Sequence, residues 1–357
     1  MTLSRRQALG AIAAGAATPA LATPAIAQSR VEWRMVTSWP KNLPGPGVTA
    51  ERLAERVAQM SAGRFTIKVH AAGEIVPALQ VFDAVASGVA QMGHTAPLFW
   101  AGKMPAAPLF TAGPFGLTPL EHITWIDQGG GQALWDELYA PAGIKPFMAG
   151  NTGFQMGGWF KREINSVADI VGLKMRIPGL GGLVMQKLGA VPVTIAPGEI
   201  LLALQSGVLD ATEFLGPFSD IAMGFQRAAK FYYHPGWHEP NGTGEALVSL
   251  DAWNSLPADL QAILSHACAA ENVFAVGESE WMNAETLTRL MSEDGVQLRA
   301  FPDDFMQAAR GAASEVMSDL AAKSDLTRRI VESYLGAARH QAEWSAVSVR
   351  SFLAVRG

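Results

Sequence analysis

Two kinds of hydrophobic pattern alternate along the chain from residue 31 onward. Val31–Thr37 alternates apolar and polar positions, which is typical of a half-buried β-strand. From Thr49 to Met60 the apolar residues fall on a helical repeat, and Arg64–Val69 alternates again. This strand, helix, strand order favours a parallel sheet with a right-handed crossover.

The same kind of alternation continues through residue 205 and predicts a second α/β unit that starts near Ile144. Two further helical pieces are expected within residues 118–140, divided at Gly129–Gly131. The remaining elements expected here are helices at Val81–Ala86, Gly182–Leu188 and Ile200–Gln205, and strands at Lys145–Ala149, Gln155–Phe160, Leu173–Ile177 and Val191–Thr194.

Beyond residue 240 the pattern is mainly helical. Ser255 and Pro257 predict the start of a helix that runs to Met291, because proline is favoured in the first helical turn. A strand at Val296–Arg299 and a helix from Asp303 follow. The last element, Leu326–Phe352, is long for a globular helix, so it is expected to span domains or to meet a partner. Its apolar residues near one face are Ile330, Tyr334, Ala338, Trp344 and Val347.

Length and composition support two folded domains. The chain has 357 residues, of which 49% are hydrophobic and 17% charged, and this composition excludes disordered, collagen-like and coiled-coil proteins. The formal net charge is −5, and no basic cluster predicts nucleic-acid binding. The single cysteine, Cys268, excludes an internal disulfide and a thiolate metal site, and its apolar surroundings predict a small core residue.

Residues 1–27 are typical of an export signal that is removed. They contain no acidic residue, and Arg5 and Arg6 precede an apolar run rich in Ala and Gly. Ala25–Ala27 supplies a small-x-small cleavage pattern, while Pro19 and Pro24 argue against a spanning helix. The paired arginines resemble a twin-arginine signal, which predicts a periplasmic protein.

Several common catalytic motifs are absent from the sequence. It has neither the Gly-x-Ser-x-Gly elbow of α/β-hydrolases nor a P-loop. Residues 179–184 approach a dinucleotide fingerprint, but Val184 replaces the third glycine. His234 and His238 have the spacing of a helical zinc pair, yet Pro235 and Gly236 between them predict a loop with ordinary histidines.

Polar residues at strand ends and in loops of the second unit are the better candidates for a site. Arg176 ends a predicted strand, where α/β folds bind ligands, and a guanidinium can hold a carboxylate through two hydrogen bonds. Glu213 lies in an apolar stretch, where burying its charge is costly without a cation or donors. Glu239 and Gln155 lie in other loops, and a structural role remains the alternative for each of the four.

Three segments together resemble the extracytoplasmic solute receptors of tripartite ATP-independent periplasmic (TRAP) transporters. These segments are Lys174–Pro178, Ala203–Ala211 and Trp253–Pro257. The resemblance covers most of the chain after residue 27 and implies an α/β fold of two lobes with mixed sheets, crossing strands and long inter-lobe helices. The expected division is lobe I at 28–150 with a return at about 240–300, lobe II at 151–239 with part of about 300–325, and a C-terminal helix at 326–357.

The segment Thr212–Glu213–Phe214 looks like the branch of that family that binds 2-oxo or 2-hydroxy monocarboxylates with a metal ion. The resemblance implies that Arg176 takes the substrate carboxylate. Gln155, Glu213, the carbonyl of Phe214 and Glu239 would ligate the ion. The other residues assigned to the substrate site are Asn151, Phe99 and Trp100, with Trp39 as a further wall; core packing is an equal alternative for the two tryptophans.

An all-oxygen ligand set suits Ca²⁺ or Na⁺. Arg176, Glu213, Glu239 and a monocarboxylate together carry a charge of −2, which a divalent ion would neutralise, so Ca²⁺ is weakly preferred. The implied function is capture by cleft closure and delivery to the membrane permease, without catalysis. An exported lyase or oxidoreductase acting on a carboxylic acid is the alternative, and the C-terminal helix is either a homodimer element or a bridge between the lobes.

Overall fold

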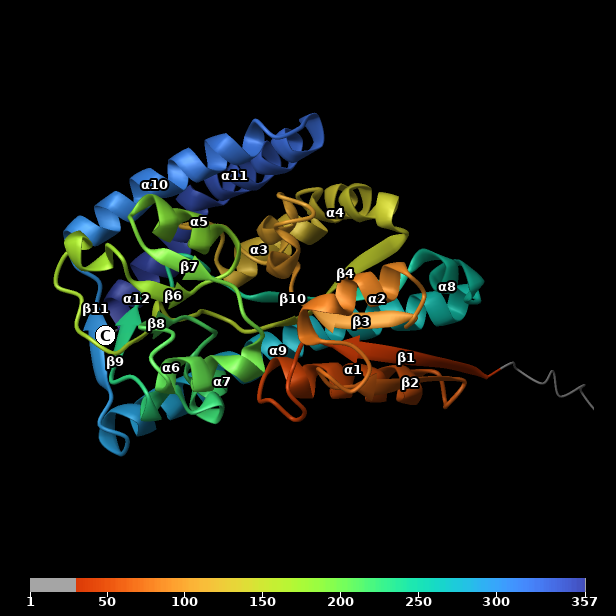
Figure 1. Cartoon of the computed structure of the whole chain (residues 1–357). Helices are drawn as coiled ribbons and strands as arrows, with labels where there is room; N and C mark the ends of the chain where they lie inside the picture. The colour runs from red at the N-terminus through yellow and green to blue at the C-terminus, as the bar shows by residue number, and fades with distance from the viewer. Residues whose placement is uncertain (1–29, 357) are drawn as a thin grey trace, which may run out of the picture.

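A computed structural model describes residues 30–356 and contains two sheets with helices packed on both (Figure 1). The predicted segment 1–27 lies outside the described residues. The first sheet has the order β2-β1-β3-β10-β4, in which β1 is parallel to β2 and β3, whereas β10 runs antiparallel to β3 and β4. Its strands are β1 (Val31–Thr37), β2 (Phe65–His70), β3 (Met92–Thr95), β4 (Ile144–Asn151) and β10 (Thr243–Ser249).

The second sheet has the order β11-β9-β5-β8-β6-β7 and mixes parallel and antiparallel pairs. Its strands are β5 (Gly158–Phe160), β6 (Lys174–Arg176), β7 (Val191–Val193), β8 (Ala211–Thr212), β9 (Phe231–His234) and β11 (Gln297–Ala300). We call the first sheet with its helices lobe I and the second sheet with its helices lobe II. The predicted mixed α/β architecture is therefore present, while the residue limits given for the lobes stay a prediction.

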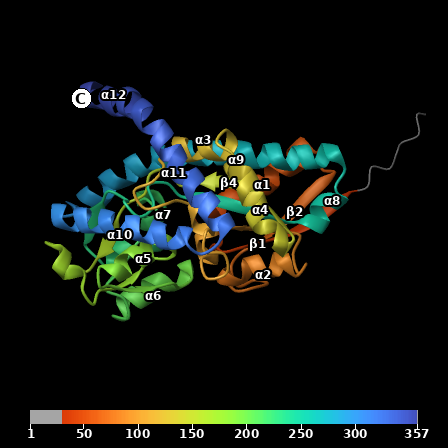
Figure 2. The ribbon, with the colours of Figure 1, turned by 90° about the horizontal axis from the view of Figure 1, so that it is seen from above.

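The helix α9 (Ala258–Ser292) joins the two lobes. It packs against β4 and α1 (Pro46–Met60) in lobe I and against α7 (Pro217–Met223) in lobe II, as the two views of the ribbon show (Figures 1 and 2). The predicted end near Met291 is confirmed, but the helix begins later than its predicted start signal: Pro257 is its N-cap and not part of its first turn, and Ser255 ends the separate helix α8. The remaining helices are α2 (Val81–Ala86), α3 (Pro119–Asp127), α4 (Gly131–Tyr139), α5 (Gly179–Lys187), α6 (Ile200–Gln205), α8 (Leu250–Ser255), α10 (Asp303–Ala321), α11 (Asp325–Ser345) and α12 (Ser351–Arg356).

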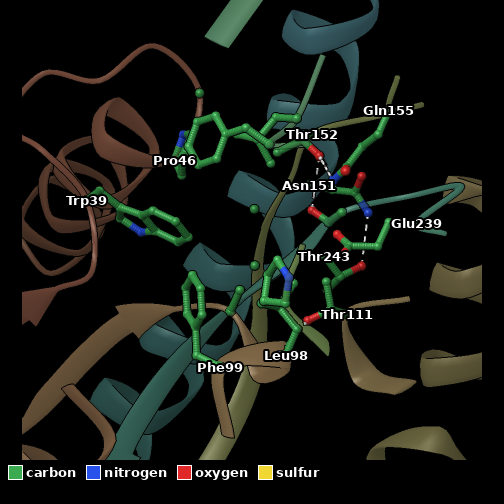
Figure 3. Close-up of a pocket in the computed structure, with 18 of the residues that line it drawn as sticks. Trp39, Pro46, Leu98, Phe99, Thr111, Asn151, Thr152, Gln155, Glu239 and Thr243 are labelled. Carbon is green, nitrogen blue, oxygen red and sulfur yellow. Dashed lines mark hydrogen bonds between the residues drawn. The ribbon is translucent and has the colours of Figure 1, made fainter. Parts of the chain in front are cut away.

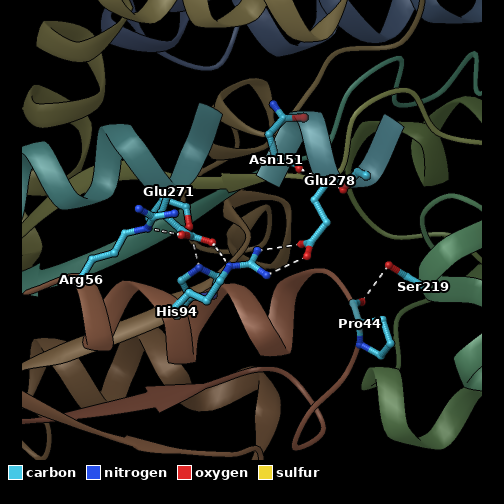
Figure 4. A network of polar contacts seen from close by, with 10 residues as sticks. Pro44, Arg56, His94, Asn151, Ser219, Glu271 and Glu278 are labelled. Carbon is cyan, nitrogen blue, oxygen red and sulfur yellow. Dashed lines mark hydrogen bonds and ion pairs between the residues drawn. The ribbon is translucent and has the colours of Figure 1, made fainter. Parts of the chain in front are cut away.

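Ion pairs attach α1 to α9 (Figure 4). The fully buried carboxylate of Glu271 accepts from Arg52 Nε at 2.8 Å and from Arg56 Nε at 2.7 Å. Arg52 also pairs at 2.7 Å with Glu278, about two turns further along the same face of α9. Because removing one partner of such a buried group leaves an uncompensated charge, this network fixes α9 on lobe I.

The C-terminal helix divides into two parts. Ile330 and Tyr334 on α11 are buried, and the Tyr334 hydroxyl accepts hydrogen bonds from the backbone N–H groups of Gly113 (2.9 Å) and Leu117 (3.0 Å). Beyond Ser345 the backbone is π-helical over residues 346–350 before α12. Trp344 and Val347 are 70% and 67% exposed, so the predicted apolar face is covered only in its first half.

Several elements differ from the sequence prediction. The helix α1 begins at Pro46 instead of Thr49, with the proline in its first turn. The strand β5 is shorter than predicted: Gly158 has φ +119°, and a Cβ there would lie 2.6 Å from the Thr212 carbonyl oxygen. The strands β3, β8, β9 and β10 were not predicted. No helix within residues 30–356 is both long enough and apolar enough to cross a membrane.

Candidate functional site

A cavity lies between the two lobes, with about 570 Å³ of empty space that includes open solvent at its mouth. Lobe I supplies mainly apolar side chains and lobe II supplies the charged ones, so the two ends of the cavity differ in chemistry (Figure 3). The lining residues that the sequence singled out are Trp39, Phe99, Asn151, Gln155, Arg176, Glu213, Phe214 and Glu239.

Arg176 is the last residue of β6, as predicted, and is 2% exposed. Its Nη1 donates to the Glu213 carbonyl oxygen at 3.0 Å and more closely to Glu213 Oε1. The guanidinium carbon lies 5.6 Å from the centroid of the Phe214 ring. Its Nε is buried and has no hydrogen-bond partner among the described residues, so this arginine has donor capacity left for a ligand.

Glu213 follows β8, and the backbone holds it beside Arg176. Its N–H donates to the Arg176 carbonyl oxygen at 3.0 Å, and its side chain is 1% exposed. The second carboxylate oxygen, Oε2, lies 3.2 Å from His238 Nε2. Since a carboxylate only accepts, His238 donates through Nε2 and orients Glu213 toward the cavity.

Glu239, which is 5% exposed, lies next to this pair. Burial and then the charge of Glu213 raise the pKa of Glu239 well above its usual value, while Arg176 lowers it. Glu213, His238 and Glu239 each offer an atom that could hold a metal ion, and these atoms lie within 4.8 Å of one another. The negative charge of this cluster is what a cation would compensate.

Gln155 and the loop after Glu213 supply the other predicted oxygen ligands. Gln155 donates through Nε2 to Thr152 Oγ1 at 3.0 Å, which leaves Oε1 buried and without a partner within residues 30–356. Asp220 holds the loop behind Phe214, because its Oδ1 accepts from the Leu215 N–H at 3.1 Å. An unpartnered buried acceptor beside the carboxylate of Glu239 fits an oxygen-coordinated cation.

Asn151 lines the cavity, but its amide contacts other protein groups. Its Nδ2 donates to Asn241 Oδ1 at 2.7 Å and to Thr243 Oγ1 at 3.0 Å. Its Oδ1 accepts from the Gly153 N–H at 2.9 Å. The hydrogen bonds of Asn151 therefore stabilise the loop that leads to Gln155.

Trp100 requires a correction. It does not line the cavity: it is 1% exposed, packs on Phe82 at a centroid distance of 5.3 Å, and donates through Nε1 to Glu245 Oε1 at 2.6 Å. Its neighbour Phe99 faces the cavity instead (Figure 3). The two residues lie in one 3₁₀ turn, Pro97–Trp100, in which consecutive side chains point in different directions. Trp100 is therefore a core residue, which was the alternative to its role as a wall of the substrate site.

His238 is a site residue that the sequence did not reveal, as is His94, which lines the cavity. The predicted loop is present, but the histidine at its end is fully buried against Glu213, and its Nδ1 has no partner in the part of the chain that the structure describes. His234, at the end of β9, does not line the cavity. The adjacency of His238 to Glu239 is the signal that could have drawn attention to it.

The comparisons with known proteins identify the family. Residues 35–324 match the bacterial extracellular solute-binding proteins of family 7, named DctP. The chain belongs to the DctP family of TRAP solute-binding proteins. It is 44% identical over 322 residues to a monocarboxylate 2-oxoacid-binding periplasmic protein of Nostoc sp. PCC 7120, covering 90% of this chain and 88% of that protein.

Two solved structures of TRAP solute-binding proteins extend the comparison. One, from Pseudoalteromonas atlantica with bound sodium and pyruvate, has 40% identity and a TM-score of 0.89, and covers 92% of this chain and 99% of its own. The other, from Bordetella bronchiseptica, is a dimer with copurified calcium and picolinate. It has 36% identity and a TM-score of 0.89, and covers 91% of this chain and 96% of its own. The predicted two-lobed fold and the periplasmic, TRAP-linked class of this DctP-family chain are confirmed.

Proposed function

We propose that this DctP-family protein captures a 2-oxo or 2-hydroxy monocarboxylate together with one cation and delivers the acid unchanged to a TRAP membrane permease. The observation that carries the proposal is the pairing of a buried arginine that has unused donors with two buried glutamates on one wall of the cavity between the lobes. Arg176 would hold the ligand carboxylate through forked hydrogen bonds. The relative that binds 2-oxoacids and the neighbour with pyruvate support this choice of ligand.

Gln155, Glu213, the Phe214 carbonyl and Glu239 would hold the cation. The ion would supply positive charge at the point where the negative charge of the ligand carboxylate lies next to the negative charges of the two glutamates. Arg176, both glutamates and the acid carry −2 together, so we propose Ca²⁺ in preference to Na⁺ because a divalent ion leaves no uncompensated buried charge. The neighbours contain either ion, which supports both members of this pair.

Lobe closure would complete the capture. Lobe I carries the apolar wall and lobe II the charged one, so a ligand that contacts both stabilises the closed arrangement. The loop contact between Ser219 Oγ and the Pro44 carbonyl oxygen, 2.9 Å apart, lies at the junction of the lobes (Figure 4).

Thermal unfolding with and without pyruvate and Ca²⁺ tests this function. A ligand at about 100 times its Kd stabilises the folded state by about 2.7 kcal/mol. Arg176→Ala should abolish this shift, and Arg176→Lys, which keeps Glu213 paired but lacks the fork, should lose most of it. An undiminished shift in both variants would place the carboxylate anchor elsewhere. Recovery of chemically altered acid after incubation would favour the alternative of an exported lyase or oxidoreductase.

We also propose that the exposed end of the C-terminal helix forms a homodimer contact. Trp344, Val347 and Phe352 are each more than half exposed, and one neighbour is a dimer. Native mass spectrometry should give a dimer for the whole chain and a monomer after removal of residues 346–357. A monomeric full-length chain would contradict the contact.

The same spectra of protein exported from cells should show cleavage after Ala27 if residues 1–27 are a twin-arginine signal.

A further inference from the structure

Trp39 forms the apolar end of the cavity, opposite the charged residues (Figure 3). It is 4% exposed and faces Phe99 at a centroid distance of 6.2 Å. Its carbonyl oxygen accepts from the Ala72 N–H at 3.0 Å, and its indole Nε1 donates to His94 Nδ1 at 2.8 Å. Backbone and side chain are thus both fixed.

The contacts of His94 determine which of its ring nitrogens carries the proton. An indole N–H only donates, so Nδ1 must accept. Nε2 therefore carries the hydrogen and donates to the Ala149 carbonyl oxygen at 2.8 Å. His94 is 1% exposed, and burial lowers its pKa to about 4, so the ring stays neutral at neutral pH.

The imidazole links the residues after β1 to β4, two strands that are not neighbours in the sheet of lobe I. His94 lies on β3, Trp39 follows β1, and Ala149 lies on β4, which β10 separates from β3. Thr49 of α1 packs closely on the next residue, Gly150, where a Cβ would lie 2.7 Å from Thr49 Cγ2. The ring of Trp39 is therefore held in a fixed position on the lobe I wall of the cavity.

We propose that His94 is a positioning residue for ligand selectivity: it holds Trp39 as the wall that limits the length of the ligand's side chain. The inference rests on the proposed function, since Arg176 and the cation fix the carboxylate end of the acid. The apolar tail then points to Trp39 and Phe99. The preferred ligand is a short 2-oxo or 2-hydroxy acid, and longer branched acids meet the indole.

The test is the ratio of two dissociation constants, that of pyruvate divided by that of 4-methyl-2-oxopentanoate, measured by calorimetry with Ca²⁺ present. Trp39→Ala should raise this ratio by about tenfold or more, because each methylene of room in an apolar pocket changes discrimination by about that factor. A general loss of stability would weaken both acids alike and leave the ratio unchanged. An unchanged ratio in Trp39→Ala would overturn the wall.

Two substitutions of His94 separate its two hydrogen bonds. His94→Asn keeps an acceptor near the position of Nδ1 and loses the donor to Ala149. His94→Gln keeps a donor near the position of Nε2 and leaves Trp39 Nε1 without an acceptor. If His94 acts through Trp39, His94→Gln moves the ratio in the same direction as Trp39→Ala, and His94→Asn stays closer to the wild type.

A double variant tests whether His94 acts through Trp39. Trp39→Phe has no indole N–H, so adding His94→Gln to it should leave the ratio where Trp39→Phe sets it. Additive effects, or equal ratios in His94→Asn and His94→Gln, would overturn the positioning role. If the wild-type protein binds neither acid with Ca²⁺ present, the proposed function fails first and the inference with it.

Discussion

Glu245 is a buried carboxyl group whose environment predicts a measurable dependence of stability on pH. It lies on β10 and is fully buried, with Oε1 accepting from Trp100 Nε1 and Oε2 without a partner among residues 30–356. Burial raises its pKa from 4.5 to about 8, although Trp100 and Tyr139 lower it. The group is therefore mainly protonated in the folded protein at neutral pH.

The size of the effect follows from the two pKa values. The difference between 4.5 and about 8 corresponds to about 5 kcal/mol at 1.36 kcal/mol per unit. Below pH 4.5 both states are protonated, and above about pH 8 both are ionised. Between these limits the folded state binds more protons than the unfolded state, so the free energy of unfolding falls by up to about 1.4 kcal/mol per pH unit as pH rises.

Urea unfolding of the wild type and Glu245→Gln at several pH values measures this slope. The amide is neutral at every pH, so the variant should gain about 4 kcal/mol on the wild type between about pH 5 and about pH 8. Glu32→Gln, which changes an exposed carboxylate on β1 of the same sheet, is the matched control and should follow the wild type. If the free energy of unfolding depended on pH in the same way for the wild type and Glu245→Gln, the reasoning would be refuted. Such a result would mean that the buried carboxyl group ionises at the same pH in the folded and the unfolded protein.

Two further substitutions test single buried hydrogen-bond acceptors by urea unfolding. Tyr334→Phe leaves the N–H groups of Gly113 and Leu117 unpaired and should cost about 3 kcal/mol, whereas no change would show that water replaces the hydroxyl. The Asp220 carboxylate accepts hydrogen bonds from the Leu215 N–H and from Trp159 Nε1. Asp220→Asn replaces one of its two acceptor oxygens by an NH₂ donor that faces these donors, and should lower the free energy of unfolding by about 1–3 kcal/mol. It should also weaken pyruvate binding, since the Leu215 loop carries a proposed ligand of the cation; unchanged calorimetric affinity would separate Asp220 from the site.

Long periodic segments were predictable from the sequence because local pattern determines them. The helix over Ala258–Ser292 and the two pieces on either side of Gly129–Gly131 depend on apolar spacing, proline and glycine, which the sequence displays directly. Arg176 at the end of a strand was predictable for the same reason.

Other elements depend on partners distant in the chain. The strand β8 has only two residues and exists because it pairs with β5 and β6. The strand β10 lies between β3 and β4, which come from much earlier in the chain. Its position in the sheet therefore depends on distant partners, which its own sequence does not indicate. Both strands are fixed by tertiary pairing and not by their own periodicity.

The same reason explains the residues that were misplaced in the site. Whether Phe99 or Trp100 faces the cavity depends on the direction of one 3₁₀ turn. His238 becomes relevant only when the loop after β9 is packed on Glu213. The hydrogen bond between Trp39 and His94 forms because β1 and β3 pair side by side in the sheet, and no spacing in the sequence indicates it.

The most direct test of the central claim, that a cation and Arg176 together capture a monocarboxylate, is calorimetric titration of pyruvate into metal-stripped protein with and without added Ca²⁺. We expect one saturable site with Ca²⁺. Without the ion we expect an affinity at least about 100-fold weaker, because an uncompensated buried charge costs about 3–5 kcal/mol. The Glu213→Gln variant should lose most of the effect of Ca²⁺. Equal affinity for pyruvate in the metal-stripped and Ca²⁺-loaded protein would contradict the account.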